Sequence, residues 1–317
     1  MNTKSAIGIT LLALSYGQFL LPRYENYADA PPYFWAILFI LGTFLMFGII
    51  FISEGITEAV YKKSLLRAIF KNAHTVIAYL VLSMVGAVML DGVSQWLGKL
   101  WFYPTLTNAT YPFVFVLGFA FYWLMVIESY LGVKALLDLA LKGKRMVRTY
   151  FGFERPLYTS LGAFGILLIP IAAALMTNDY AVQRGGYVFE LTHAVDYKVN
   201  FAYILFMFFG TWFLFEAIEY FRKETSLLRD IFHHYFTPLI AVVIASLGTA
   251  LLMETQNFFA GAGAWVYTNW PLQEITFLGL PVVMFLFWPI HYIFFLSLWR
   301  AFSDKESDEV WKGDLVP

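Results

Sequence analysis

Apolar residues gather in eight blocks along this chain, and polar segments separate the blocks. The blocks lie at approximately 6–21, 33–53, 73–90, 111–132, 157–176, 199–221, 237–252 and 272–298. Most are roughly 17–25 residues long, which is the length a helix needs to cross about 30 Å of hydrocarbon at 1.5 Å per residue. The pattern predicts an all-α fold, a polytopic transmembrane helical bundle of about eight spans.

The composition agrees with a membrane environment. Of the 317 residues, 60 % are hydrophobic, 20 % are aromatic and 14 % are charged, whereas a soluble domain is about half apolar and a quarter charged. The chain has no cysteine, which excludes disulfides, iron–sulfur clusters and thiolate chemistry. A net charge of −1 gives no reason to expect nucleic acid as a partner.

The distribution of basic residues predicts the orientation. With eight spans, only four of the 21 Lys and Arg residues fall on the side opposite the N-terminus, and the other 17 fall on the side of the N-terminus. The four are Arg23, Lys99, Arg184 and Lys198. Cytoplasmic loops carry the excess of basic residues. We therefore expect a multi-pass protein of the cell membrane with both termini in the cytoplasm.

One stretch of the chain occurs twice. FISEGITEAVYKKSLLRAIF at 51–70 aligns without a gap on FLFEAIEYFRKETSLLRDIF at 213–232, at a constant offset of 162. The alignment matches Glu54 with Glu216 and the run Ser-Leu-Leu-Arg at 64–67 with the same run at 226–229. Apolar composition does not explain matched Glu, Ser and Arg residues, so we interpret the two segments as an internal duplication.

The duplication predicts how the chain is divided. We expect a first four-helix repeat at 1–142, a basic cytoplasmic linker at 143–156, a second four-helix repeat at 157–300 and a polar cytoplasmic tail at 301–317. Because four is an even number of spans, both repeats enter the membrane in the same direction. The pseudo-symmetry axis is then expected along the membrane normal, unlike that of inverted repeats.

The outer loops of the two halves share a motif. Asp91 is followed ten residues later by Trp101-Phe-Tyr103, and Glu254 is followed eleven residues later by Trp265-Val-Tyr267. One interpretation is an aromatic belt, because Trp and Tyr favour the membrane interface whatever the function. The other is a site in which each half supplies an acid and two aromatic side chains.

Titratable residues also lie within or at the edges of the apolar blocks, where insertion costs roughly 2.5–3.5 kcal/mol each. The main candidates are Glu54, Glu128, Glu216 and His291. They could bind substrate or form a proton relay, or the acids could pair with Arg67 and Arg229 near the cytoplasmic surface. His291 follows Pro289, so it could instead satisfy a backbone carbonyl that the proline leaves free. No spacing of residues predicts a metal site, and no motif predicts a cofactor.

The segment from Glu254 to Phe277 carries a resemblance. Its residues Trp265-Val-Tyr267 and Pro271-Leu-Gln-Glu274-Ile-Thr-Phe277 resemble the membrane lycopene cyclase domain of carotenoid biosynthesis. That family tends to show an acid, Trp-x-Tyr, and Pro-Leu-Glu-Glu before an apolar helix. Here Gln273 replaces the first Glu of the pair, and each half has four spans where that domain is usually drawn with three. The resemblance covers about 30 of the 317 residues.

The resemblance implies acid catalysis on a polyene. A carboxylic acid in a dry pocket stays protonated and can protonate a carbon–carbon double bond, and aromatic faces stabilise the carbocation that forms. The acids would be Glu254, Glu274 and Asp91. The aromatic residues would be Trp101, Tyr103, Trp265 and Tyr267.

Three functions remain open at this point. The first is a cofactor-independent cyclase, hydratase or isomerase of a long isoprenoid or carotenoid dissolved in the membrane. The second is a proton-linked carrier with its site between the two repeats. The third is a non-catalytic subunit of a membrane complex. The expected partners are membrane lipid or an isoprenoid, with an oligomer or complex as a further expectation.

Overall fold

The computed structural model describes residues 2–22, 30–107, 109–141, 152–186, 188–223, 225–259, 265–277 and 280–304. The helices of the first half are α1 (Thr3–Ser15), the 3₁₀ turn η1 (Tyr16–Leu20), α2 (Pro32–Tyr61), α3 (Leu65–Ile69), α4 (Ala73–Asp91), the π-helical turns η3 (Gly92–Leu97) and η4 (Val114–Gly118), α5 (Tyr111–Phe113) and α6 (Phe119–Leu141). Those of the second half are α7 (Glu154–Arg184), α8 (Phe201–Lys223), α9 (Leu227–Phe232), α10 (Thr237–Phe259) and α11 (Val283–Phe302). The strands β1 (Trp101–Phe102), β2 (Val266–Tyr267), β3 (Thr276–Phe277) and β4 (Leu280–Pro281) form two short antiparallel pairs.

In the part of the chain that the structure describes, seven helices are long and apolar enough to cross a membrane. The chain is therefore a multi-pass integral membrane protein with an all-α fold. The segment predicted as the first span, 6–21, differs from the others. It forms the 13-residue helix α1 and the five-residue turn η1, so α1 alone covers only about 20 Å at 1.5 Å per residue.

The last predicted span, 272–298, is corrected by the structure. Residues before Val283 form the β3–β4 pair instead of helix, and α11 runs from Val283 to Phe302. Pro281 lies in β4 and cannot donate a backbone hydrogen bond, which suits it to an edge strand or to the start of a helix. Most of the predicted linker 143–156 and of the tail 301–317 lies outside the described residues.

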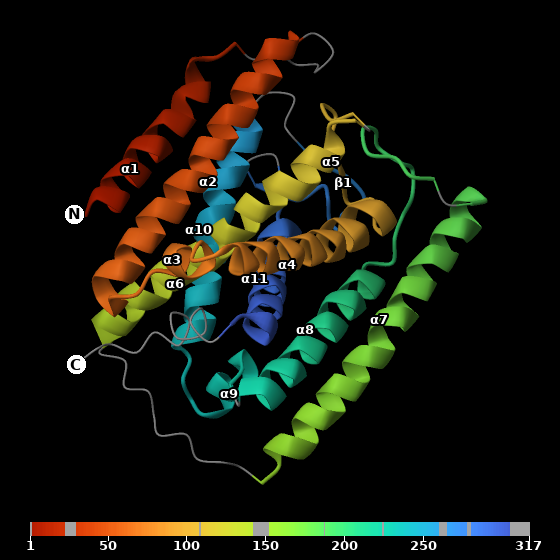
Figure 1. The fold of residues 1–317 in the computed structure, drawn as a ribbon. Helices are drawn as coiled ribbons and strands as arrows, with labels where there is room; N and C mark the ends of the chain where they lie inside the picture. The colour runs from red at the N-terminus through yellow and green to blue at the C-terminus, as the bar shows by residue number, and fades with distance from the viewer. Residues whose placement is uncertain are drawn as a thin grey trace.

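Two helix hairpins flank a central group of helices (Figure 1). The pairs α1–α2 and α7–α8 pack side by side along their lengths, and α4, α6, α10 and α11 lie between the two pairs. A glycine at the contact in each hairpin allows this close packing. A Cβ atom added at Gly48 of α2 would lie 2.9 Å from the backbone nitrogen of Leu12, and one at Gly210 of α8 would lie 3.1 Å from Cβ of Leu168.

The two similar segments at 51–70 and 213–232 have a similar local structure. The side chain of Ser64 caps α3 by accepting from the backbone N–H of Arg67, and Ser226 caps α9 by accepting from that of Arg229. In each segment, the preceding acid contacts the short helix that follows it. Glu54 accepts from the backbone N–H of Leu65 in α3, and Glu216 accepts from that of Leu228 in α9. Each Glu therefore fixes a cap at a helix start, which is an ordinary stabilising role for an acid there.

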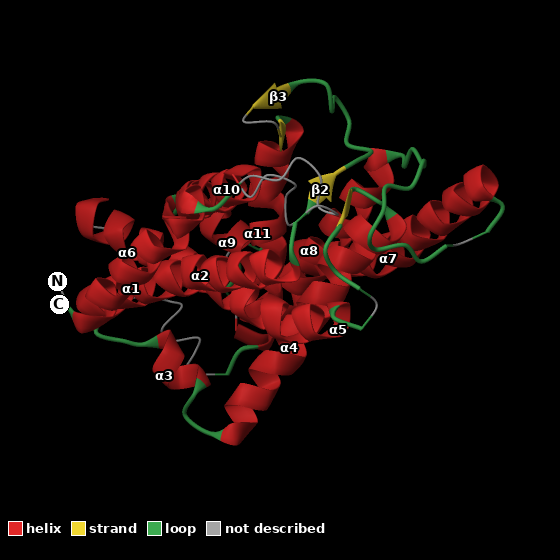
Figure 2. Cartoon of the chain, turned by 90° about the horizontal axis from the view of Figure 1, so that it is seen from above, coloured by secondary structure: helices red, strands yellow, loops and turns green. Residues whose placement is uncertain are grey.

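The strands β1 and β2 join the two halves. They pair antiparallel with Trp101 opposite Tyr267 and Phe102 opposite Val266. This register has two-fold symmetry. A rotation about an axis that passes between Phe102 and Val266 would exchange the Trp-x-Tyr motif at 101–103 with the one at 265–267. In the view from above, β2 lies inside the outline of the molecule and β3 lies at its rim (Figure 2).

Candidate functional site

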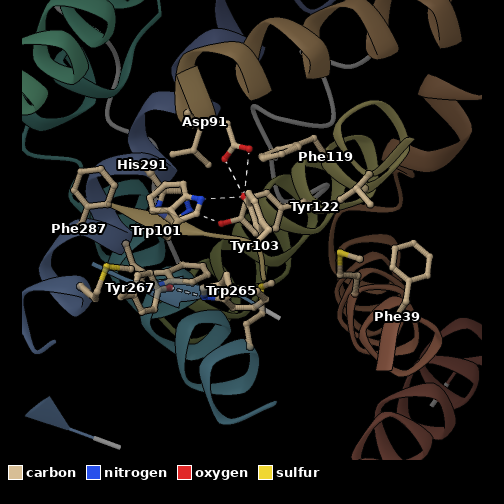
Figure 3. Close-up of a pocket in the computed structure, with 17 residues that line it drawn as sticks. Phe39, Asp91, Trp101, Tyr103, Phe119, Tyr122, Trp265, Tyr267, Phe287 and His291 are labelled. Atoms are coloured by element: carbon tan, nitrogen blue, oxygen red, sulfur yellow. Dashed lines mark hydrogen bonds between the residues drawn. The ribbon is translucent and has the colours of Figure 1, made fainter. Parts of the chain in front are cut away.

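A cavity of about 230 Å³ lies where the two halves meet (Figure 3). Its walls come from α2, α4, η4, α6, α10, α11 and the strands β1 and β2. Of the residues that the structure describes, the lining contains one carboxylate, Asp91, and no Lys or Arg. Most of the other lining residues are aromatic or aliphatic, among them Phe39, Phe119, Phe287 and Trp288. The cavity is therefore apolar, with a single acid at its wall.

The alternation of side chains along a strand explains why both Trp-x-Tyr motifs reach this cavity. Residues two apart on a strand lie on the same face, so Trp101 and Tyr103 share a face, as do Trp265 and Tyr267. Antiparallel pairing in the observed register puts all four side chains on one face of the ribbon. All four line the cavity.

The same hydrogen-bond chain connects each motif to its acid. The indole Nε1 of Trp101 donates to the hydroxyl of Tyr103 at 2.9 Å, and that hydroxyl donates to Asp91 Oδ1 at 3.0 Å. Trp265 Nε1 donates to the hydroxyl of Tyr267 at 2.8 Å, and that hydroxyl donates to Glu254. Asp91 and Glu254, at the ends of α4 and α10, are both buried. The predicted grouping of an acid, a Trp and a Tyr in each half is present in the structure.

Asp91 has an additional chain that Glu254 lacks. The hydroxyl of Tyr111 donates to Asp91 Oδ2 at 2.7 Å and accepts from Trp96 Nε1 at 2.9 Å. Both oxygens of Asp91 therefore receive a phenol O–H, and each phenol receives an indole N–H. Glu254 Oε2 has no hydrogen-bond partner among the described residues. The two acids occupy equivalent places but have different environments.

Burial also affects the two phenols that contact the acids. Burial and the neighbouring carboxylate raise the pKa of Tyr103 well above its ordinary value, and the same two causes raise the pKa of Tyr267. Both phenols consequently keep their protons at neutral pH. Each hydroxyl can act as a hydrogen-bond donor to its acid.

His291 reaches the cavity from α11. Its Nε2 lies 2.7 Å from the hydroxyl of Tyr122, and both residues line the cavity. The ring of Trp288 meets that of His291 edge to face, with their centroids 4.7 Å apart. His291 is thus a component of the cavity wall, two residues after Pro289.

Two π-helical turns border the cavity. The turn η3 begins directly after Asp91, and η4 supplies the lining residues Val114 and Gly118. Such turns are rare and occur frequently at functional sites, because the wider turn redirects neighbouring side chains. Their position beside the acid supports the choice of this cavity as the functional site.

Other predicted site residues lie elsewhere. Glu274 is exposed in the turn before β3 and does not line the cavity. Glu54 and Glu128 are buried next to each other, and Lys4 contacts Glu54 at 2.9 Å. Glu216 lies in α8 instead, where its side chain accepts from Trp212 Nε1 and from the backbone N–H of Leu228 in α9. The structure therefore does not gather these acids and His291 into one relay.

Among the described residues, Arg67 pairs with an acid of its own segment, as expected, whereas Arg229 pairs with an acid from another segment. Arg67 contacts Glu58 at 3.4 Å, and Arg229 contacts Glu154 at 3.1 Å. Glu154 begins α7, outside the duplicated segment. The Arg229–Glu154 pair joins segments 75 residues apart in sequence, and both pairs are consistent with a structural role.

Sequence reasoning missed Tyr111, Trp96, Tyr122 and Trp288 as components of the site. Tyr111 and Trp96 lie outside the duplicated pattern, so comparison of the halves could not reveal them. Tyr122 and Trp288 lie inside apolar blocks that contain many other aromatic residues. Only their contacts distinguish them from those residues.

No family model, no curated protein and no solved structure matches this chain. The site must consequently be interpreted from its own geometry. Among the described residues, no three His, Asp or Glu side chains lie close enough together to hold a metal ion.

Proposed function

We propose that this chain is an enzyme of the lipid phase that rearranges a long isoprenoid or carotenoid by acid catalysis. The observation that carries the proposal is the meeting of two Trp–Tyr–acid chains at one apolar cavity. Such a cavity provides a proton source and aromatic faces for a carbocation and has few groups that could attack the cation. The lycopene cyclase resemblance of the segment from Glu254 to Phe277 agrees with this chemistry.

The position of the cavity opening supports a substrate that enters from the membrane. Phe39 lines the cavity and its side chain is 57 % exposed, so the cavity reaches the surface beside α2. Nearby exposed residues of α2, α5 and η4 are Ile40, Phe113 and Leu117, all apolar. An opening surrounded by apolar residues suits a hydrocarbon chain that lies in the bilayer.

The proposed proton step uses groups of this chain alone. Tyr267 lines the cavity, and Glu254 lies behind it at hydrogen-bond distance. The O–H bond of Tyr267 breaks as its proton binds one carbon of a double bond, whose π electrons form the new C–H bond. In the same step the phenol oxygen takes the proton of Glu254, whose carboxyl group has turned so that its O–H points at that oxygen, and Glu254 becomes a carboxylate.

The adjacent carbon of the substrate is then a cation. For an isomerisation, a neighbouring carbon then loses a proton, which returns through Tyr267 to Glu254. For a cyclisation, the π electrons of a second double bond of the substrate first attack the cation and form the ring, and the carbon next to the new cation loses the proton. Neither reaction leaves a net change in the enzyme. Hydration would need only water as a second reactant. General acid catalysis of this type contributes typically 10²–10⁴-fold to a rate.

The proposal includes the arrangement of the chain in the membrane. Residues 1–142 and 157–300 would be two like-oriented four-helix repeats, with both termini in the cytoplasm and the protein in the cell membrane. The matching caps of α3 and α9, the matching glycines at 48 and 210, and the symmetric register of β1 and β2 support the duplication. With η1, the helix α1 would reach about 30 Å and could complete an eighth span.

The carrier function has less support from the site. A proton-linked carrier needs titratable groups in one continuous path, and Glu128 and Glu54 lie apart from the contacts of Glu216 and His291. Replacing Glu216 by Gln should leave proton-linked uptake into proteoliposomes absent or unchanged if the chain is an enzyme. Loss of a measurable uptake in that variant would favour the carrier instead. Constant purification with stoichiometric partners and no activity would favour the non-catalytic subunit.

The test compares isoprenoids extracted from cells that lack the gene with those from cells that carry it. Wild type should convert one coloured or colourless isoprenoid into another. Glu254→Gln should lose at least about 100-fold of this activity, since it removes the proton source. Glu274→Gln is the matched control, because the same change is made at an exposed position of the same motif. Full conversion by a normally expressed Glu254→Gln variant would overturn the proposal.

A further inference from the structure

We infer that the two equivalent acids have opposite protonation states, so that Asp91 is a permanent negative charge of the cavity and Glu254 carries the exchangeable proton. This inference rests on the proposed function for the use made of the proton. It assigns to each half of the duplication a different task within a single site. It also predicts the class of ligand that the cavity holds most tightly, a lipid-soluble molecule with a positive centre.

The hydrogen bonds of Asp91 carry the first half of the inference. A carboxylate is an acceptor only, whereas a protonated acid must also place its own O–H. Tyr103 and Tyr111 both donate to Asp91, and the N–H groups of Trp101 and Trp96 occupy the phenol oxygens as acceptors. Every donor in these two chains points toward the acid. The arrangement satisfies an anion and offers a proton on Asp91 little opportunity to bond.

Within the described part of the chain, the charge on Asp91 has no partner of opposite sign. Buried charges are normally paired, because the unpaired charge is costly in a medium of low dielectric constant. No Lys or Arg lines the cavity, and no described ion pair includes Asp91. A positive centre in the bound molecule would supply the missing charge. The aromatic side chains around it would add cation–π attraction.

Glu254 receives fewer hydrogen bonds than Asp91, which favours its protonated form. It accepts from only one phenol, that of Tyr267, and its Oε2 has no partner among the described residues. Asp91 lines the small cavity and Glu254 contacts it through Tyr267, and one negative charge in such a site costs less than two. Glu254 is the acid whose hydrogen bonding leaves an oxygen available for a proton.

The location of the acids agrees with this division. Asp91 itself lines the cavity, where a fixed charge acts on the ligand directly, while Glu254 is separated from it by Tyr267. Glu254 is therefore a positioning residue that replenishes the proton of Tyr267. The volume of about 230 Å³ and the shared walls mean that both acids act on the same part of the ligand. The duplication has produced one composite site.

Infrared difference spectroscopy of the full chain in lipid nanodiscs at neutral pH tests the charge assignment without any substrate. The spectrum of wild type minus Glu254→Gln should contain the C=O stretch of a protonated carboxylic acid. The spectrum of wild type minus Asp91→Asn should contain only carboxylate bands. A protonated band that is lost in Asp91→Asn, or is absent from the Glu254→Gln difference, would overturn the inference.

A binding measurement tests the predicted ligand class. The probes are an alkyltrimethylammonium amphiphile and its neutral isostere with carbon in place of nitrogen, followed by the fluorescence of the cavity tryptophans. Wild type should bind the cation at least about tenfold more tightly. Asp91→Asn should abolish this preference, and Asp91→Glu should retain part of it. The exposed outer-loop change Asp196→Asn is the control for surface charge and should retain all of it.

Each outcome has a defined meaning. Equal affinity of wild type for the two probes overturns the inference even if Asp91→Asn does not fold, because no variant is needed for that comparison. A preference that persists in folded Asp91→Asn overturns it as well. If the infrared and binding results are as expected but isoprenoid extracts do not depend on the gene, the charge assignment stands and the proposed function fails.

Discussion

The hydroxyl of Tyr111 offers the sharpest stability test of the site. Tyr111→Phe removes one oxygen and keeps the ring, which is 6 % exposed and packs against Tyr103 and Phe115. The change breaks the 2.7 Å bond to Asp91 and the 2.9 Å bond from Trp96. A hydrogen bond to a charged group contributes about 1.5–3 kcal/mol and a neutral one about 0.5–1.5 kcal/mol. We expect the free energy of unfolding to fall by about 2–4 kcal/mol.

The measurement is equilibrium unfolding in mixed micelles of increasing SDS content. Tyr33→Phe is the matched control, since Tyr33 is 66 % exposed and its change should stay within about 0.5 kcal/mol. In an Asp91→Asn background the cost of Tyr111→Phe should fall by roughly half, because the acceptor is then a neutral amide. A cost equal to that of the control, or one unaffected by Asp91→Asn, would refute the reasoning about this chain of bonds.

Three further predictions concern the rest of the fold. Ser226→Ala should cost about 1–2 kcal/mol in the same unfolding assay by removing the cap of α9, and a loss below about 0.5 kcal/mol would contradict the capping role. Asp138→Asn should cost about 3–5 kcal/mol because it leaves buried Lys134, 2.8 Å away, without its counter-charge; adding Lys134→Met should recover part of the loss, and no recovery would count against the pairing. Burial lowers the pKa of Lys99 from 10.5 to about 8, so between these pH values the unfolded state holds the extra proton and stability should rise with pH. Lys99→Met should remove that rise, which thermal unfolding at stepped pH would reveal.

Local patterns determined much of the architecture. Long apolar blocks in a chain without the charge to stay soluble require helices in lipid, since an unpaired backbone group in hydrocarbon costs several kcal/mol. Seven of the eight predicted blocks became long helices for this reason. The exception is the first block, which forms the short helix α1 followed by η1. The last block is shortened, because its first residues lead into the β3–β4 pair before α11 begins.

The sequence by itself also marked the acids and aromatic residues of each half, because Asp91, Glu254 and the Trp-x-Tyr motifs recur at similar spacing. It could not show that the motifs pair with one another, because strand register is a contact between residues more than 160 apart. Only the tertiary structure revealed the single cavity and placed Glu274 outside it. It alone revealed that Tyr111 distinguishes Asp91 from Glu254. The difference between two equivalent acids depends on hydrogen-bond donors from distant segments, and spacing along the chain carries no record of them.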